Sequence, residues 1–331
     1  SAPVCAPSRA SLLQGRHQGH ADVRDSQFDR ALPNNHTMAE TLRRAGYRTI
    51  HVGKNGLAGG ENSVALAGNG SENLAAHPLE RGFDEFFGYL FHGDGHEHYP
   101  RNGTTDKTAH LYDGYRQIKD ASPDLHTTDV WTAYAKKAIV EEVNDGDGQP
   151  FFLYLAYDAP HQKMQRPTVP YPANKGLNGG VQWTTATDGS GNIRYASTAT
   201  GNGTIDGYNH PDNSTSWPVQ HQQHAGMIRR IDNSVDDIIA LLKDLNIDDN
   251  TICIFTSDNG PHNERHNPRF FESFANLEGI KRDMLEGGIR VPAVVRWPGK
   301  IAGTTNDENA PHEISYPTSI WDWMPTFAAL A

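Results

Sequence analysis

Short apolar runs alternate with helical segments along this chain, and that alternation limits its possible folds more than any other feature of the sequence. In residues 37–52, Thr37 and Glu40 form the capping box that begins a helix, and Gly46 follows its last turn. The stretch that comes next, from Tyr47 to Val52, is typical of a buried strand. We therefore expect a helix followed at once by a strand.

The same arrangement recurs further along the chain. The run PFFLYLAYDAPH predicts a buried strand over 151–157 that leads into a loop with His161. Apolar residues at helical spacing over 228–245 predict a helix, and the strand after it ends at Asp258. The run RVPAVVRWPG supplies another strand. Strands separated by helices predict an α/β fold with a largely parallel sheet, whose active groups gather where the strands end.

The organisation of the chain is that of one domain with a long insertion. A chain of 331 residues can bury a sizeable core, and no linker divides it cleanly. The segment from Gln165 to Gln220 is rich in Gly, Asn and Thr and is predicted to be a long polar loop. Loops of this length are usually functional or disordered.

The charge pattern limits the partners of the protein. The net charge is −11, and acidic and basic residues are mixed along the chain, so no basic stripe is available for nucleic acid. An anionic substrate would need a local cluster of Lys, Arg, His or metal. No run of about 18 apolar residues occurs, so no membrane span is predicted, and no secretion signal is visible. The second cysteine, Cys253, lies in a predicted strand, and a disulfide framework is not indicated.

Cys5 precedes Pro-Ser-Arg at a predicted helix N-terminus, where the helix dipole and Arg9 stabilise an anion. A cysteine on its own is more often a small buried apolar residue. The whole string CAPSRASLLQGR, however, resembles the signature of the type I sulfatases of the alkaline phosphatase superfamily. The resemblance implies that a formylglycine-generating enzyme oxidises Cys5 to formylglycine, whose hydrate is the nucleophile.

Four later segments resemble the same family in the same order. The resemblance implies that Lys54 in HVGKNGL binds sulfate and that His161 in YLAYDAPH contacts the ester oxygen or protonates the leaving group. Asp258 and Asn259 in TSDNG would bind a hard cation together with modified Cys5, with calcium preferred over magnesium. Lys281 would be the second sulfate-binding lysine. Taken singly, each match has a structural alternative: a surface lysine, a structural histidine or a turn.

These residues form a chemically coherent set. Arg9, the two lysines and the cation would stabilise the charge that develops on the sulfate oxygens. The resemblance also implies an alkaline phosphatase-like fold, with a large, mostly parallel mixed sheet between helices.

The chain departs from the family pattern in two respects. Family members usually begin with a strand that ends in paired aspartates, and they end in a small antiparallel domain; neither is visible here, so we expect a fragment shortened at both ends. Many members also carry a histidine where this chain has Gly56. As a hypothesis, His17 or His20 supplies the missing base.

The histidine-rich segment FHGDGHEHYPR offers candidate sugar-binding residues, or else a polar solvated loop, or less plausibly a metal site formed by its three histidines. The candidates for contact with a sugar are His92, His96, His98, Tyr99 and Arg101.

The sequence thus predicts a sulfuric ester hydrolase acting on a sulfated small molecule or glycan. Two alternatives remain: a phosphodiesterase or phosphonate monoester hydrolase of the same superfamily, and a catalytically inactive carbohydrate-binding fragment. By analogy with the family, we expect a periplasmic or extracellular location.

Overall fold

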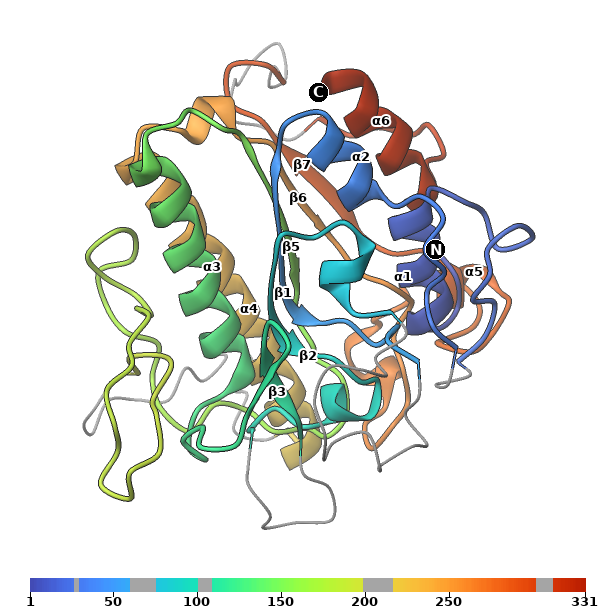
Figure 1. Ribbon diagram of the computed structural model, residues 1–331. Coiled ribbons are helices and arrows are strands. Elements are labelled where there is room, and N and C mark those ends of the chain that lie inside the picture. The colour runs from blue at the N-terminus through green and yellow to red at the C-terminus, as the bar shows by residue number, and fades with distance from the viewer. Residues whose placement is uncertain (27–29, 60–75, 101–108, 199–216, 302–311) are drawn as a thin grey trace.

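A computed structural model describes residues 1–26, 30–59, 76–100, 109–198, 217–301 and 312–331 (Figure 1). The α-helices in these ranges are α1 (Cys5–Gln14), α2 (Met38–Arg44), α3 (Thr127–Asp145), α4 (Val219–Asp244), α5 (Glu286–Ile289) and α6 (Trp323–Leu330). The strands are β1 (Arg48–Lys54), β2 (Glu85–Tyr89), β3 (Leu111–Asp113), β4 (Arg116–Ile118), β5 (Phe151–Ala156), β6 (Cys253–Thr256) and β7 (Ala293–Arg296). Short 3-10 turns are η3 (Pro78–Arg81), η4 (Gly93–His96), η6 (Asp248–Asn250), η7 (Pro268–Phe271) and η8 (Ile320–Asp322).

The central sheet has the strand order β4-β3-β2-β1-β5. Strand β1 pairs in parallel with both β2 and β5, whereas β3 and β4 extend the sheet in antiparallel fashion. Strands β6 and β7 form a separate antiparallel pair in the described part of the chain. The α/β class and the mixed sheet are confirmed; the parallel part of this sheet is the three strands β2, β1 and β5.

Helices cover both faces of this sheet, with α3 and α4 on one side and α1, α2 and α6 on the other (Figure 1). The side chains of β5 alternate accordingly. Phe152 and Tyr154 pack against the core cluster that includes Ala10 of α1, and Leu153 and Leu155 pack against the cluster that includes Trp131 of α3. This alternation with a period of two residues is what a strand buried on both faces requires.

Helix α2 begins as the sequence predicts. The Thr37 hydroxyl accepts a hydrogen bond from the Glu40 N–H at 3.1 Å, and Gly46 follows the helix with a φ of +95°, a conformation that favours glycine. The strand after it runs two residues further than predicted, to Lys54, because its parallel register with β2 continues to Tyr89.

Other boundaries differ modestly from the predictions. Strand β5 ends at Ala156 and β6 ends at Thr256, so Tyr157 and Asp258 both lie in loops just beyond strands. Helix α4 begins at Val219 rather than near Ile228, because polar residues such as Gln220 form its first turns without apolar periodicity.

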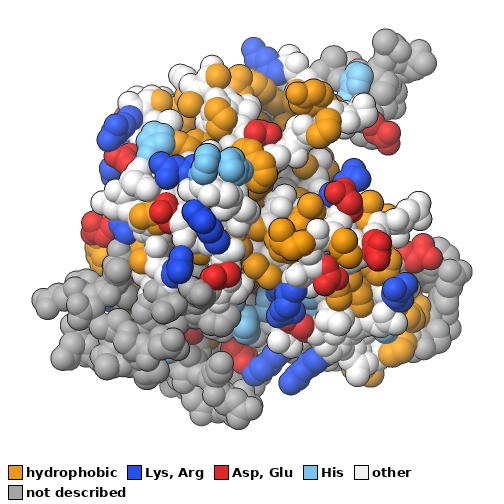
Figure 2. Space-filling view, turned by 90° about the vertical axis from the view of Figure 1, so that its right-hand side faces the viewer, with side chains coloured by type: hydrophobic (Ala, Val, Ile, Leu, Met, Phe, Trp, Pro, Cys, Tyr) orange, Lys and Arg blue, Asp and Glu red, His pale blue; other side chains and the backbone are white. Residues whose placement is uncertain are grey.

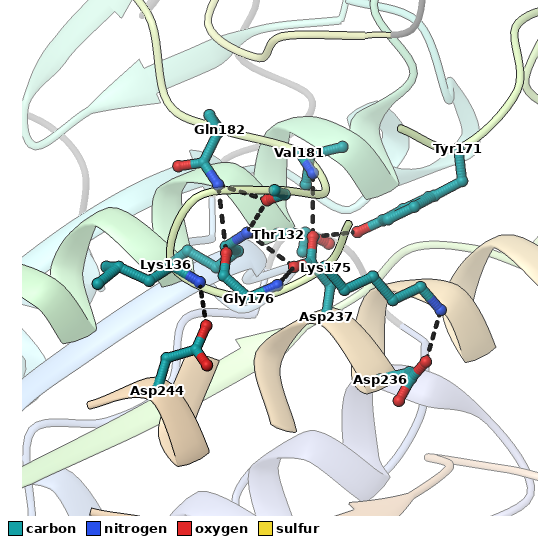
Figure 3. Close-up of polar contacts among 12 residues, drawn as sticks. Thr132, Lys136, Tyr171, Lys175, Gly176, Val181, Gln182, Asp236, Asp237 and Asp244 are labelled. Atoms are coloured by element: carbon teal, nitrogen blue, oxygen red, sulfur yellow. Dashed lines mark hydrogen bonds and ion pairs between the residues drawn. The ribbon is translucent and has the colours of Figure 1, made fainter. Parts of the chain in front are cut away.

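In the predicted polar segment, residues 165–198 contain isolated bridges but no helix or strand, whereas its last two residues, Val219 and Gln220, begin α4. Residues 165–198 are nevertheless tied to the helices by one buried carboxylate, Asp237 of α4 (Figure 3). Asp237 accepts hydrogen bonds from Lys136 Nζ at 2.7 Å, Tyr171 OH at 2.7 Å, Gly176 N at 2.8 Å and Val181 N at 2.9 Å. We refer to these five residues as the Asp237 hub.

The surface agrees with the charge pattern of the sequence. On the face shown in Figure 2, acidic and basic side chains lie interspersed among hydrophobic ones. Among the described helices, none is both long enough and apolar enough to cross a membrane.

Candidate active site

Cys5 is the first residue of α1, at the end of the helix where backbone N–H groups lack partners within the helix. Val4 precedes it without a side-chain cap, and the first turn contains no acidic residue. The Cys5 side chain is buried, and Sγ lies 3.8 Å from Nδ1 and 4.0 Å from Nε2 of His92. The sulfur therefore lies at a helix terminus whose dipole favours negative charge.

Arg9, one turn further along α1, joins three parts of the site. Its Nε donates to Asp258 Oδ2 at 2.9 Å, and its Nη1 donates to the Lys54 carbonyl at 2.8 Å. Burial alone would lower the pKa of Arg9, but Tyr154 and Asp258 outweigh it and raise that pKa. Arg9 thus holds the end of β1 and the loop after β6 against the nucleophile helix.

The two predicted sulfate-binding lysines are both buried in this site. Lys54 is 2% exposed and Lys281 is 6% exposed. A Cβ atom at Gly95 would lie 2.6 Å from Lys54 Cδ, so the glycine leaves room for the lysine stem. Burial, assisted by the nearby Lys54 charge, lowers the pKa of Lys281.

His161 lies in the loop after β5 and contacts Lys281 directly. Its Nε2 is 2.9 Å from Lys281 Nζ, and its Nδ1 is 2.7 Å from the Gln162 carbonyl oxygen. Burial and then the charges of Lys54 and Lys281 lower the pKa of His161. A neutral imidazole fits both contacts, with Nδ1–H donating to the carbonyl and Nε2 accepting from the ammonium.

We refer to Cys5, Arg9, Lys54, His161, Asp258 and Lys281 as the Cys5 site. The site holds three buried cationic side chains against the carboxylate of Asp258. Although burial would raise the pKa of Asp258, the charges of Arg9 and Lys54 lower it. The site therefore carries excess positive charge in a protein whose net charge is −11, which suits an anionic substrate.

The residues after β6 fit a hard cation. Asn259 Oδ1 is buried and has no hydrogen-bond partner among the described residues, while its Nδ2 donates to the Gly260 carbonyl at 2.9 Å. The adjacent Asp258 supplies a carboxylate. No group of three or more His, Cys, Asp or Glu side chains forms a metal site in the ranges that the structure describes. Asp258 and Asn259 would thus supply only part of the six or more oxygens that a hard cation such as calcium takes.

The sulfatase family model matches residues 1–331. The chain belongs to the sulfatase family. It is 26% identical to mouse arylsulfatase J over 99% of this chain and 45% of the relative. It is 28% identical to dog N-acetylgalactosamine-6-sulfatase, over 99% of this chain and 53% of the relative, so it spans about half the length of these curated relatives. The crystal structure of Ps i-CgsB aligns with a TM-score of 0.68 at 24% identity, covering 100% of this chain and 62% of that one, which confirms the alkaline phosphatase-like fold.

The position left open by Gly56 in this sulfatase chain faces His92. A Cβ atom at Gly56 would lie 3.5 Å from Lys54 Cε and 3.7 Å from His92 Nδ1. The His92 ring, which also lies against Cys5 Sγ, therefore fills the space toward which a side chain at residue 56 would point. Burial and the charges of Lys54, His96, Arg9 and Lys281 lower the pKa of His92.

The structure does not place His17 or His20 beside Cys5, so it gives no support to the hypothesis that either is the missing base. Both side chains are exposed and lie beyond the C-terminal end of α1. The centroid of the His17 ring is 6.1 Å from that of the Trp321 ring. Since a helix rises about 1.5 Å per residue, the ten residues of α1 place roughly 15 Å between that end and Cys5. The histidine ring that lies beside Cys5 is that of His92, in the histidine-rich loop, and the glycine at residue 56 leaves room for it.

The structure also corrects several expectations for the histidine-rich loop. His98 is fully buried, with Nδ1 2.8 Å from Asp158 Oδ2 and Nε2 2.9 Å from the His161 carbonyl, so it positions the His161 loop and does not face a sugar. Tyr99 is 6% exposed and donates its hydroxyl to the Arg166 carbonyl. His96 stacks on His161 with ring centroids 4.4 Å apart. Arg101 lies outside the described residues.

Proposed function

We propose that this chain forms the catalytic core of an enzyme that hydrolyses sulfate esters on a carbohydrate. The observation that carries the proposal is the arrangement of Arg9, Lys54 and Lys281, all buried, around a cysteine at a helix N-terminus. The excess of buried cations over the single carboxylate of Asp258 stabilises an anionic group and the charge that develops on its oxygens. The relative N-acetylgalactosamine-6-sulfatase supports a sulfated sugar as the substrate class.

The nucleophile would be formylglycine, made from Cys5 by a formylglycine-generating enzyme. Its hydrate would supply one hydroxyl that attacks sulfur and a second whose deprotonation releases sulfate. The burial of Cys5 and its helix terminus support this role, because the site excludes bulk water while backbone N–H groups face the reacting atoms.

One pair of basic residues would bind the sulfate, and a second pair, which shares Lys281 with the first, would protonate the leaving group. Lys54 and Lys281 would hold the sulfate oxygens. The Lys281 ammonium donates to His161 Nε2, so a proton held by this pair can pass to the leaving ester oxygen. Arg9 would fix Asp258 rather than touch the substrate, because its Nε and Nη1 donors are engaged with Asp258 and the Lys54 carbonyl.

His92 would be the base for sulfate release. Its ring lies beside Cys5 Sγ, within reach of a hydroxyl of the hydrate. Its pKa is lowered by burial, so the ring is unprotonated at neutral pH. Asp258 and the unpartnered Oδ1 of Asn259 would contribute to the site of a calcium or magnesium ion, which would polarise the attacking hydroxyl and neutralise sulfate charge.

The test combines conversion of Cys5 to formylglycine with an assay of sulfate release. The protein carrying this chain is produced with and without a formylglycine-generating enzyme, and the Cys5 peptide is analysed by mass spectrometry. We expect aldehyde in place of thiol and sulfate release only from the matured protein; Cys5→Ala should release none. Aryl phosphodiesters and phosphonate monoesters serve as competing substrates. Faster turnover of either, or no turnover of any ester after full conversion, would refute the sulfatase assignment.

The base is tested with matched histidine variants. His92→Gln should slow sulfate release at least about a hundredfold, whereas His17→Gln should match the parent because His17 is exposed far from Cys5. Equal rates for His92→Gln and the parent would remove His92 from the mechanism.

A further inference from the structure

A cavity of about 570 Å³ lies near the Cys5 site, and none of the six residues of that site lines it. Two cationic residues line the cavity, Lys163 in the loop after His161 and Arg265 in the loop after β6. The remaining lining residues are Met164, Gln165, Gln220 and Gln223.

Histidines link the site to both of the segments that carry these cations. The Lys163 N–H donates to the His96 carbonyl at 3.1 Å, and the His96 ring stacks on His161. In the second segment, the His262 ring, three residues before Arg265, lies 5.9 Å from the His161 ring. The segments that line the cavity are thus in contact with the residues around His161.

The charge of the cavity favours an anion. Both ionisable residues that line it are cations. Lys163 pairs with the buried Glu97, but no described residue pairs with Arg265, whose side chain is exposed and whose backbone has a φ of +64°. A left-handed φ is unusual for a residue other than glycine, and such positions cluster at binding sites.

Helix α4 adds to the positive electrostatic potential of the cavity. Gln220 and Gln223 belong to its first turns, its first turn contains no acidic residue, and its N-cap makes no side-chain hydrogen bond. A helix of 26 residues directs a partial positive charge toward this end.

Buried ring nitrogens border the same two segments. His224 follows Gln223, and His266 follows Arg265; each is 7% exposed. Nδ1 of His224 lacks a hydrogen-bond partner among the described residues. Buried polar atoms normally have partners, so this nitrogen is consistent with a polar ligand or water beside Gln223.

We propose that this cavity binds a second anionic group of the substrate, a sulfate ester or a carboxylate on the sugar unit next to the one that is desulfated. The proposal rests on the proposed function. Arg265 binds the anion, since a guanidinium matches carboxylate and sulfate geometry. The amides of Gln165, Gln220 and Gln223 donate to and accept from sugar hydroxyls.

The experiment compares three disaccharides on the matured protein. One carries a single sulfate, one carries a second sulfate on the neighbouring unit, and one carries a carboxylate there. We expect both doubly charged substrates to have a KM at least about tenfold lower than the first. In Arg265→Gln this advantage should disappear through KM, with kcat unchanged and with hydrolysis of an aryl monosulfate unchanged. If only one of the two doubly charged substrates shows the advantage, that result identifies the anion.

Arg269→Gln is the matched control, because Arg269 is exposed in the same stretch, over the Phe274 ring and outside the cavity. It should keep the parental preference. Equal KM values for the three substrates in the parent, or a preference that survives Arg265→Gln, would overturn the subsite.

Failure of the proposed function gives a different result, namely no hydrolysis of any sulfate ester by fully converted protein. Calorimetric binding of the doubly sulfated disaccharide to Cys5→Ala then still decides the subsite. We expect Arg265→Gln to weaken that affinity at least about tenfold, and equal affinities would refute the proposal.

Discussion

The Asp237 hub and the Cys5 site are both clusters of buried charge, yet they are built in opposite ways. In the hub, one carboxylate accepts hydrogen bonds from an ammonium, a phenol and two backbone amides, and the Lys136 charge balances it. In the Cys5 site, three buried cations face the single carboxylate of Asp258. In the first arrangement the charges balance, whereas the second keeps an excess of positive charge.

This difference separates residues that stabilise the fold from residues that bind and react. A buried charge with all of its partners rigidifies the elements that supply them, here α3, α4 and residues 165–198. Like charges held together cost folding free energy, and such local conflicts are expected at functional sites. Substitutions in the two clusters should therefore change different measurements.

The largest effect is expected for Asp237→Ala. The change leaves the Lys136 ammonium buried without its counter-charge, so the free energy of unfolding should fall by about 3–5 kcal/mol in urea titrations. Asp236→Ala is the matched control, since Asp236 is the neighbouring residue and its side chain is 67% exposed. A loss below about 1 kcal/mol for Asp237→Ala would show that the hub does not hold the fold.

Lys281→Met should lower the activity without lowering the stability. Sulfate release should fall at least about a hundredfold, because one of the cations that stabilise the transition state is lost. The free energy of unfolding should stay equal or rise, because burial and Lys54 already lower the pKa of Lys281 and so disfavour its charge. A variant that loses both activity and stability would show that Lys281 is a structural residue, and the contrast between the clusters would fail.

The histidines near the Cys5 site should contribute to the pH dependence of stability, whereas the hub contains no histidine. Burial, followed by His266 and Lys281, lowers the pKa of His262 from 6.5 to about 4. Below pH 6.5 the unfolded chain therefore binds a proton that the folded chain does not, and stability falls until the pH reaches about 4. His262→Gln should remove about 2–3 kcal/mol of this fall between pH 6.5 and 4, measured by urea denaturation at each pH. An unchanged pH profile would exclude His262 as a source.

The sequence predicted the elements that carry strong local signals. The cap at Thr37, the strand that begins at Phe151 and the placement of His161 in the loop beyond it all follow from periodicity and capping. The family resemblance then named Lys54 and Lys281, which the structure brings into one buried site with Cys5.

The sequence could not predict contacts that depend on distant segments. His92 lies beside Cys5 although 87 residues separate them, whereas His17, closer in sequence, is carried away by the length of α1. Asp237 lies in a helix with an ordinary amphipathic pattern, and nothing local marks it as the partner of Gly176 and Val181. The separate pairing of β6 with β7 is likewise a matter of tertiary arrangement, which strand propensity does not specify.

The smallest effect is expected for Lys175, which lies at the exposed edge of the Asp237 hub. Lys175 donates to Asp236 at 2.6 Å and to Asn233 at 3.1 Å, and its partner Asp236 is largely exposed. Exposed ion pairs contribute little because water and salt screen them, so Lys175→Gln should lower the free energy of unfolding by less than about 1 kcal/mol. The loss should shrink further in 1 M NaCl, and sulfate release should match the parent. A loss as large as that of Asp237→Ala would mean that residues 165–198 are anchored at their exposed rim, and the buried carboxylate would no longer explain how this segment is held.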